Sequence, residues 1–496
     1  MSETAFEFAE ATITDLGARM AAGELTSARL TEAYVNRIEA LDRRGPELRS
    51  VIGVEPDAVD VARSLDAERA AGRVRGPLHG IPILIKDNIE TAGALPTTAG
   101  SLALGEARAT RDATLVARLR DAGAVILGKA NLSEWANFRS TRSSSGWSAV
   151  GGQGRNPYAL DRNPCGSSSG SGAAVAANLC AAAIGTETDG SIVCPSSING
   201  IVGIKPTVGA VSRAGVVPIS HTQDTPGPMA RTVADAMFVL EAVAGADERD
   251  PATRRLETAT APRPNLNGVR IGVARNLAGF HPGVDARFEE AIGALRSLGA
   301  EIADPVEIPH ANALEAPELE VLLYEFKADL EAYLAHVPGA AARTMADLIA
   351  FNRRHATEEM PFFGQEIFEQ AAEKGPLTER AYLEALATCA RLSRGEGLDA
   401  AFKANGVEVV VAPTNSPAWL TDHVNGDHYV GGNSSPAAVA GYPSVPVPMG
   451  DVAGLPVGIS FLGRAWRDAE IVAIAEVFER ETRLRRTPTF AASVDA

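Results

Sequence analysis

Residues 165–195 read CGSSSGSGAAVAANLCAAAIGTETDGSIVCP. Two turns rich in glycine and serine flank a segment of small apolar residues, which is predicted to form a buried helix. A buried segment between two such turns can bring several hydroxyls and backbone N–H groups to one point, as nucleophilic catalysis with an oxyanion hole requires. The stretch lacks the Gly-Lys-Ser or Gly-Lys-Thr ending of a phosphate-binding loop, so nucleotide binding is disfavoured.

Short apolar runs alternate with amphipathic segments around this stretch. Residues 82–86 and 124–128 are predicted to be buried strands, and residues 114–122 between them an amphipathic helix. Such alternation favours βαβ units and a mostly parallel or mixed sheet. The remaining predicted strands lie at residues 202–206, 269–274, 406–413, 444–448 and 456–462.

The chain has no internal repeat and no clean linker. We therefore expect a single large α/β domain over residues 1–496, with a central mixed sheet flanked by helices. Residues 314–402 are strongly helical and carry much of the charge. We expect this segment to be an insertion packed on one edge of the core, where it shapes the substrate cleft.

The net charge limits the kinds of partner that the chain can bind. Its 496 residues carry a formal charge of −16, and the pI is about 5.1, which argues against nucleic acid and against an anionic membrane surface. The N-terminus has no basic region followed by an apolar core, and no apolar run is long enough to span a bilayer. We expect a cytoplasmic protein that binds a small-molecule or peptide substrate, with a homo-oligomer left open.

The chain has four cysteines, Cys165, Cys180, Cys194 and Cys389, and none of them forms a Cys-x-x-Cys pair. Their spacing disfavours both structural zinc and a disulfide framework, so we expect all four to be small buried side chains. The sequence also lacks the histidine and carboxylate spacings typical of metal sites. We expect neither a metal nor a cofactor.

Ser191 is a candidate nucleophile because it follows Gly190, which permits a tight and sterically open turn. In such a turn, the successive backbone N–H groups of residues 188–191 can point at a developing oxyanion. The dipeptide Asp189-Gly190 is equally common in ordinary turns, so Ser191 taken alone does not fix the chemistry.

Lys86 is a candidate base because it directly follows the apolar run of residues 82–85. Burial would lower the pKa of its ammonium group and let the neutral amine accept a proton near neutral pH. The alternative is a lysine at a strand end whose side chain extends to water. Asp87 would oppose the shift if it pointed inward, so we expect it to point away or to be held by other hydrogen bonds.

Ser167, Ser168 and Ser169 lie between Gly166 and Gly170 and match the pattern Gly-x-Ser-x-Gly. The pattern raises an alternative nucleophile, Ser168 at the strand-to-helix elbow of an α/β-hydrolase. That elbow needs a strand immediately before it, whereas the preceding residues are predicted to form a loop. We therefore disfavour Ser168 as the nucleophile.

Together these segments resemble the amidase signature family of serine hydrolases. The resemblance rests on residues 80–88 (GIPILIKDN), 123–132 (GAVILGKANL), 166–170 (GSSSG) and 185–192 (GTETDGSI). It implies the amidase signature fold and a Ser–cis-Ser–Lys triad, which supports hydrolysis of carboxamide bonds through an acyl-enzyme. In this chain the implied residues are the nucleophile Ser191, the bridging Ser167 with a cis peptide bond before it, the base Lys86, and an oxyanion hole at Thr188, Asp189, Gly190 and Ser191.

Two departures from the usual family pattern narrow the resemblance. Asp189 stands where a glycine is common, and Cys165 precedes the serine-rich turn. Both departures resemble the pattern of bacterial peptide amidases, which release ammonia from C-terminally amidated peptides. The resemblance also leads us to expect that Asn137 and Ser168 contact the substrate. A general aliphatic or aryl amidase is an alternative function, and a glutaminase component of a tRNA-dependent amidotransferase is a less favoured one.

Overall fold

The computed structural model describes residues 6–258 and 263–494, and its first half is built on a six-stranded sheet. The two neighbouring strands β2 and β6 are parallel, so their carboxyl ends lie at the same edge. β3 is also parallel to β2, whereas β1, β8 and β7 pair antiparallel to their neighbours. In spatial order the strands are β1 (Val51–Val54), β3 (Val125–Ala130), β2 (Pro82–Lys86), β6 (Ala182–Glu187), β8 (Thr225–Ala230) and β7 (Val202–Gly203).

A second, five-stranded sheet comes from the second half of the chain. β9 and β11 are parallel, β10 is parallel to β9, and β13 pairs antiparallel with both β11 and β12. Both sheets are thus mixed. In spatial order the strands are β10 (Glu301–Val306), β9 (Arg270–Ala274), β11 (Val409–Pro413), β13 (Leu455–Leu462) and β12 (Ser444–Val452).

The two sheets meet at one residue pair. Lys205 and Ser444 exchange two backbone hydrogen bonds of 2.9 Å. Pro206 and Pro443 lie next to this pair, both on the same side of it. The predicted α/β domain with a mixed sheet flanked by helices is confirmed, and its strands are divided between two sheets that join edge to edge.

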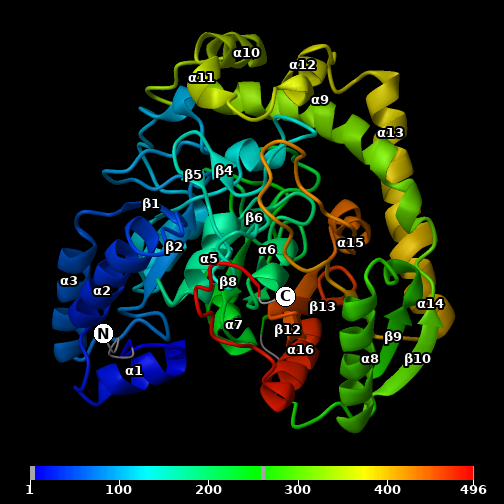
Figure 1. Cartoon of the computed structure of the whole chain (residues 1–496), viewed down its shortest axis with the longest axis horizontal. Helices are drawn as coiled ribbons and strands as arrows, with labels where there is room; N and C mark the ends of the chain where they lie inside the picture. The colour runs from blue at the N-terminus through cyan, green and yellow to red at the C-terminus, as the bar shows by residue number, and fades with distance from the viewer. Residues whose placement is uncertain (1–5, 259–262, 495–496) are drawn as a thin grey trace.

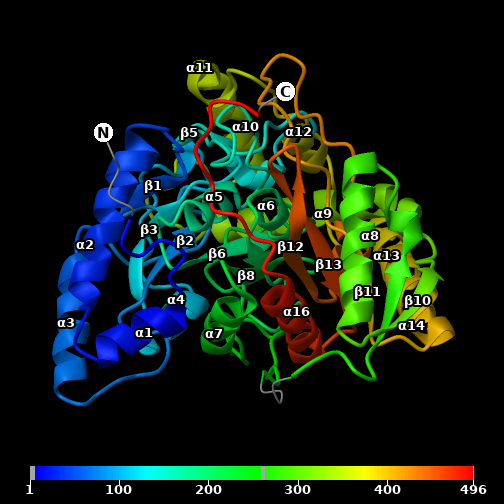
Figure 2. The ribbon, with the colours of Figure 1, turned by 60° about the horizontal axis from the view of Figure 1, so that its bottom comes forward.

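Helices cover both sheets, as Figures 1 and 2 show. α1, α2 and α3 lie at one end of the molecule beside the six-stranded sheet, and α8 and α14 lie at the other end beside the five-stranded one (Figure 1). Thr26 caps the N-terminus of α2, because its side chain accepts a hydrogen bond from the backbone N–H of Arg29. The helices that flank the two sheets are α1 (Ile13–Ala21), α2 (Ser27–Arg37), α3 (Ala58–Ala70), α4 (Thr114–Asp121), α7 (Val233–Val243), α8 (Pro282–Ser297), α14 (Asp399–Asn405), α15 (Ser434–Ala440) and α16 (Asp468–Thr482).

Residues 314–402 contain a run of helices that arches over one side of the molecule, along the top and right of Figure 1. Trp135 and Phe368 pack edge to face across the contact between this run and the core. The run includes α9 (Glu315–Leu334), α10 (Met345–Arg354), α11 (Ala356–Glu359), α12 (Glu366–Ala372) and α13 (Arg380–Ala390), and it continues through a π-helix over Arg391–Leu398 into α14.

The small-residue segment in the middle of residues 165–195 is only partly helical, which corrects the sequence-based expectation. α5 (Ser169–Ala176) ends before Asn178, whose φ of 58° is in the left-handed region, and the chain then enters strand β6. Periodicity cannot distinguish a buried helix from a buried strand over so short an apolar run. Ser191 therefore follows a strand of the sheet and precedes α6 (Val193–Ile198).

One apolar core connects the two halves of the chain. Its largest cluster of buried side chains includes Ile83 and Ile85 of β2 together with Val409 and Val411 of β11. Since the same core serves both sheets, the chain folds as a single domain. Among the described helices, none combines the length and apolar character needed to cross a lipid bilayer.

Candidate active site

Lys86 is the last residue of β2, and its side chain points into the interior beside the carboxyl end of β6. Its Nζ lies 2.8 Å from Ser167 Oγ, 2.8 Å from Thr186 Oγ1 and 3.2 Å from the Thr186 carbonyl oxygen. A neutral amine has two hydrogens and one lone pair. If the two hydrogens are donated to Thr186, the lone pair is left facing the Ser167 hydroxyl.

The charge state of Lys86 fits this geometry. The side chain is fully buried, and burial lowers its pKa to about 7, although the carboxylates of Asp224 and Glu187 act in the opposite direction. A large fraction of Lys86 is therefore neutral near neutral pH and can accept a proton. The alternative of a lysine extended to water is wrong.

Asp87 does not face Lys86. Its Oδ2 accepts hydrogen bonds from the backbone N–H and the hydroxyl of Thr98, and Lys129 Nζ lies 3.7 Å from its other carboxylate oxygen. The expectation that Asp87 is held by other hydrogen bonds is confirmed. The Asp87 carboxylate therefore belongs to a separate buried network with Thr98 and Lys129.

The peptide bond between Gly166 and Ser167 is cis, as the resemblance implied. A Cβ atom on Gly166 would lie 2.0 Å from Ser133 Oγ, so only glycine fits there. The Ser167 carbonyl accepts a hydrogen bond from the Ser133 backbone N–H (3.0 Å). The serine turn is therefore held closely against the segment that follows β3.

Ser191 lies next to this turn, because the Ser168 backbone N–H donates to the Ser191 carbonyl oxygen at 3.2 Å. Within the described part of the chain, no hydrogen bond joins the hydroxyls of Ser167 and Ser191. Hydrogen bonds between catalytic groups are often long without substrate and shorten in the Michaelis complex. The approach of the two hydroxyls is thus set by the two backbone segments that carry them.

The turn at residues 188–191 has free donors. Gly190 takes a φ of 81°, and no group in the described structure accepts a hydrogen bond from the backbone N–H of Asp189, Gly190 or Ser191. The next two N–H groups, of Ile192 and Val193, donate to Glu187 Oε2 at 2.7 and 2.9 Å. Because the buried Glu187 fixes the following turn, the free N–H groups have a defined position in which they could bind an oxyanion.

Thr188 is held from the other side by Asp224. The Thr188 hydroxyl donates to Asp224 Oδ1 at 2.6 Å, and Asp224 Oδ2 accepts from the backbone N–H groups of Ile219 and Ser220. Burial raises the pKa of Asp224 to about 6. The loop at residues 219–224 therefore supports the start of the Ser191 turn.

A cavity of about 430 Å³ opens directly over Ser191. Asn137 lines it, and its Oδ1 has no hydrogen-bond partner among the described residues, whereas its contact with substrate stays a prediction. Helix α9 contributes Leu322 to the wall. The full lining consists of Ala136, Asn137, Phe138, Ser145, Cys165, Gly166, Thr188, Asp189, Gly190, Ser191, Cys194, Ile219, Leu322, Trp419, Asp427, Tyr429, Gly432, Ser434 and Ser435.

Ser168 does not line this cavity, so its expected contact with substrate is corrected. It is fully buried, and its hydroxyl donates to the Thr186 carbonyl at 3.0 Å and accepts from the Thr186 N–H at 3.2 Å. The chain before it forms no strand, so the hydrolase elbow is absent as well. Ser168 instead joins α5 to β6.

The cavity wall carries acidic groups and no basic side chain among its described residues. Asp189 Oδ2 accepts a hydrogen bond from the Ser435 hydroxyl at 2.6 Å, whereas Asp189 Oδ1 has no partner among the described residues. Burial and the charge of Asp189 raise the pKa of the nearby Glu318 well above its usual range. Asp427, the second acidic wall residue, accepts from the Ser145 N–H at 2.8 Å.

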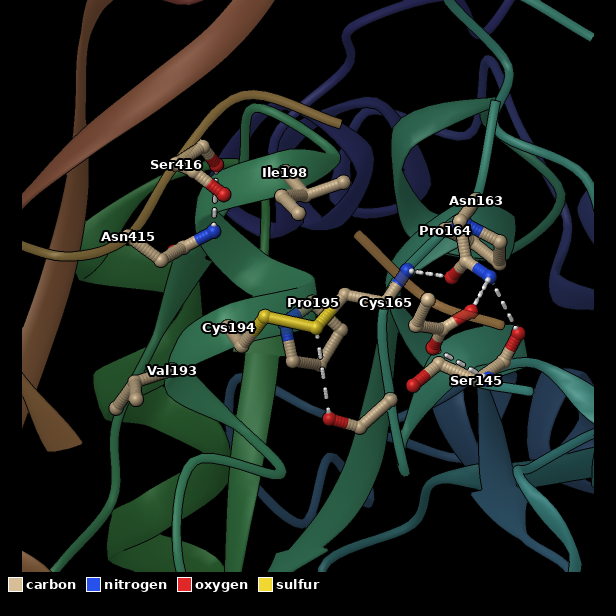
Figure 3. The surroundings of a disulfide bond; sticks show 12 residues. Ser145, Asn163, Pro164, Cys165, Val193, Cys194, Pro195, Ile198, Asn415 and Ser416 are labelled. Carbon is tan, nitrogen blue, oxygen red and sulfur yellow. Dashed lines mark hydrogen bonds between the residues drawn. A yellow bond between two sulfur atoms is a disulfide. The ribbon is translucent and has the colours of Figure 1, made fainter. Parts of the chain in front are cut away.

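Cys165 and Cys194 form a disulfide bond at the edge of the cavity (Figure 3), which contradicts the expectation of four unpaired cysteines. The pairing was missed because the two residues are 29 apart in sequence and meet only when α6 packs against the serine turn. Cys180 and Cys389 are free and buried, as predicted. Disulfides persist mainly in oxidising compartments, so this bridge does not support the expected cytoplasmic location, which stays a prediction.

His221, Glu325 and Asp329 form a group whose ligand atoms could surround a metal ion. His221 Nδ1 lies 2.9 Å from Asp329 Oδ2, and its Nε2 lies 3.4 Å from Glu325 Oε1. Glu325 also accepts hydrogen bonds from Thr222 and Tyr382. These contacts fasten the loop at residues 219–224 to α9, and the group does not line the cavity over Ser191.

Sequence reasoning missed several supporting residues. Thr186 and Glu187 lie at the end of β6, which runs parallel to β2, and β2 ends at Lys86. Adjacent parallel strands bring their carboxyl ends together, so the position of Lys86 at a strand end was the signal that could have found them. Residues 419–435 gave no local signal. They supply Trp419, Asp427, Tyr429, Gly432, Ser434 and Ser435 to the cavity through contacts far apart in sequence.

Comparisons with known proteins agree on one family. The family model described as Amidase matches residues 29–472. A probable amidase of Arabidopsis thaliana is 41% identical over 500 residues, which cover 98% of this chain and 93% of that protein. A glutamyl-tRNA(Gln) amidotransferase component of Symbiobacterium thermophilum is 37% identical over 478 residues, 93% of this chain and 95% of that protein.

Solved structures give a similar result. The native peptide amidase from Stenotrophomonas maltophilia is 52% identical with a TM-score of 0.92, over 98% of this chain and 99% of that one. A peptide amidase in complex with the competitive inhibitor chymostatin is 52% identical with a TM-score of 0.93, over 97% and 99% of the two chains.

Proposed function

The chain belongs to the amidase family and is an amide-hydrolysing enzyme, and from this premise we propose that it deamidates the C-terminal carboxamides of peptides or amino acid amides. We assign the reaction to Ser191 as nucleophile, Ser167 as bridge and Lys86 as base. The observation that carries the assignment is the 2.8 Å contact between buried Lys86 Nζ and Ser167 Oγ, beside the cavity over Ser191.

The proton path follows from these contacts. Neutral Lys86 accepts the proton of Ser167, which takes the proton of Ser191 as Ser191 Oγ attacks the amide carbonyl carbon. The tetrahedral intermediate then collapses, the C–N bond breaks, and ammonia leaves with a proton returned through Ser167. Water attacks the acyl group on Ser191 by the same relay and releases a carboxylic acid.

The free N–H groups of Asp189, Gly190 and Ser191 supply the oxyanion hole in this proposal, with Thr188 as a further donor. Loss of one such donor typically raises the barrier by about 3 kcal/mol. Glu187 acts indirectly, because it holds the turn that follows. It is a positioning residue.

The charge of the cavity supports a neutral carboxamide as substrate. Asp189 and Asp427 line it, and no lysine, arginine or histidine is among its described lining residues. A peptide that ends in a carboxylate would meet these charges without a cationic partner. A peptide amide has no such negative charge and avoids this repulsion. The carboxylate formed by hydrolysis is repelled by the two acidic side chains, which weakens binding of the product.

The test compares ammonia release from a dipeptide amide with release from simple aliphatic and aryl amides. The proposal predicts a higher kcat/KM for the dipeptide amide and an intact internal peptide bond. Faster turnover of a simple amide would favour the general amidase and would contradict the peptide assignment. The Ser191 mechanism would stand in either case.

Similarity to glutamyl-tRNA(Gln) amidotransferase components favours a second candidate, a glutaminase that passes ammonia to a partner protein. The cavity weighs against this candidate, since the α-carboxylate of glutamine would have no cationic partner among the described lining residues. Glutamine-dependent ammonia release comparable to that from a peptide amide would restore it.

The activity should depend on pH through Lys86. We expect kcat/KM for a peptide amide to fall as the pH drops below about 7, because protonated Lys86 cannot accept the Ser167 proton. Burial also raises the pKa of Asp224, to about 6, so its carboxyl can add a second acid limb to the profile. Initial rates between pH 5 and 9 give the profile, and a rate that stays flat to about pH 5 would exclude Lys86 as the base.

Replacing Asp189 by Asn should strengthen binding of the peptide acid product. The substitution keeps the size of the side chain and removes one negative charge from the cavity. We expect the Kd of a dipeptide acid to fall about tenfold, a change of about 1.4 kcal/mol, with Asp422→Asn, a half-buried acidic residue outside the cavity lining, as the matched control. Calorimetry measures this without turnover, and an unchanged Kd in Asp189→Asn would contradict charge-based exclusion of carboxylates.

A further inference from the structure

The disulfide connects the two segments that carry the proposed catalytic serines. Cys165 lies two residues before Ser167, and Cys194 lies three residues after Ser191. The Cys194 backbone N–H donates to the Gly190 carbonyl at 2.8 Å, so a shift of Cys194 is passed directly to the turn that holds Ser191. On the other side, only Gly166 separates Cys165 from Ser167.

The other links between these segments are single hydrogen bonds. The Ser168 N–H donates to the Ser191 carbonyl at 3.2 Å, and Asn199 Nδ2 donates to the Pro164 carbonyl at 2.9 Å. The hydroxyls of Ser167 and Ser191 are not hydrogen-bonded to each other. The distance between these two oxygen atoms therefore depends on the positions of the two backbone segments. The disulfide is the covalent constraint on that distance.

The disulfide borders the substrate cavity. Both cysteines line the cavity over Ser191, and Cys165 and Cys194 are 5% and 7% exposed. In Figure 3 the bridge runs from α6 to the segment that carries Asn163 and Pro164. A dithiol small enough to enter the substrate cavity can therefore reach it, whereas Cys180 and Cys389 are buried away from the cavity.

Given the proposed function, on which this assignment rests, we propose that the Cys165–Cys194 disulfide positions Ser167 relative to Ser191 and makes turnover depend on its redox state. A dithiol reduces the bridge through a mixed disulfide. The S–S bond breaks, two electrons and two protons pass to the sulfurs, and the dithiol becomes a cyclic disulfide. The two segments then have no covalent link at this point and are held by hydrogen bonds and by the packing of buried side chains around Ile198.

The kinetic effect should be specific. A misplacement of about 1 Å between reacting groups can cost on the order of a hundredfold in rate. We expect a smaller loss, about tenfold in kcat, because the hydrogen bonds between the segments remain. KM should change less than about twofold, since Asn137, Leu322 and the lining residues within 419–435 belong to other segments of the chain.

The experiment measures kcat and KM for a peptide amide before and after treatment of the folded wild-type enzyme with dithiothreitol. Alkylation and intact mass report the state of the bridge, and circular dichroism reports the fold. We expect kcat to fall on reduction and to recover when the bridge is re-formed. Cys165→Ala/Cys194→Ala should show the low kcat without treatment and should not respond to the dithiol.

The matched control is Cys180→Ser/Cys389→Ser, which removes both free thiols and keeps the bridge. It should respond to dithiothreitol as the wild type does. An unchanged kcat in a folded enzyme with the bridge fully reduced would overturn the proposal, even if the thermal midpoint fell. An oxidised enzyme that releases no ammonia and leaves Ser191 unlabelled by a serine-reactive probe would instead overturn the proposed function itself.

Discussion

Ser191→Ala is expected to lower kcat for a peptide amide by about 10⁴-fold or more, with little change in fold. Without the Ser191 hydroxyl no acyl-enzyme forms, and only binding and oxyanion stabilisation remain. Ser191 lies at the cavity in a turn fixed by Glu187, so removal of one oxygen atom leaves no buried charge unpaired. Ammonia release measured over hours at high enzyme concentration would quantify the residual rate.

The control for this prediction is Ser168→Ala, because Ser168 is the centre of the Gly-x-Ser-x-Gly pattern. Its hydroxyl bonds only to the backbone of Thr186, so the variant should lose stability and keep kcat within about tenfold of the wild type. A variant pair with the opposite behaviour, in which Ser168→Ala is inactive and Ser191→Ala is active, would show that the nucleophile is misassigned.

Lys86→Met should lower kcat about 10³-fold, because general-base catalysis contributes roughly 10² to 10⁴ in rate. Methionine fills a similar buried volume without an amine, so the proton of Ser167 has no acceptor. The acid limb near pH 7 should disappear from the residual activity. Stopped assays of ammonia release across the pH range measure both effects.

Lys86→Arg separates a base from a fixed positive charge. Arginine keeps a cation and hydrogen-bond donors beside Ser167 and Thr186, yet it stays protonated at every accessible pH. The proposal predicts that this variant is about as inactive as Lys86→Met. Near wild-type activity in Lys86→Arg would mean that the amine at this position supplies charge and not a proton acceptor.

Local features of the sequence singled out Lys86 and Ser191 as candidates, and the family resemblance joined them with Ser167 into one predicted triad. Lys86 ends an apolar strand, and Ser191 follows a glycine whose positive φ opens the turn. These features depend on a few neighbouring residues, so they can be seen without the fold. The strand β6 was misjudged as helix because small apolar residues suit either structure when buried.

The features that were missed depend on contacts between distant segments. The pairing of Cys165 with Cys194, the loop at residues 419–435 and the support of Thr188 by Asp224 arise only when strands and helices pack. Their residue types carry no periodic or spacing signal of their own. Such supporting contacts need a structure.

The most direct test of the account is the site of covalent labelling by a fluorophosphonate probe, located by mass spectrometry of fragmented peptides. We expect a single adduct on Ser191, formed at a rate that falls as Lys86 is protonated, and no adduct in Ser191→Ala. An adduct on Ser168, or steady amide hydrolysis by an enzyme that the probe leaves unlabelled, would contradict it.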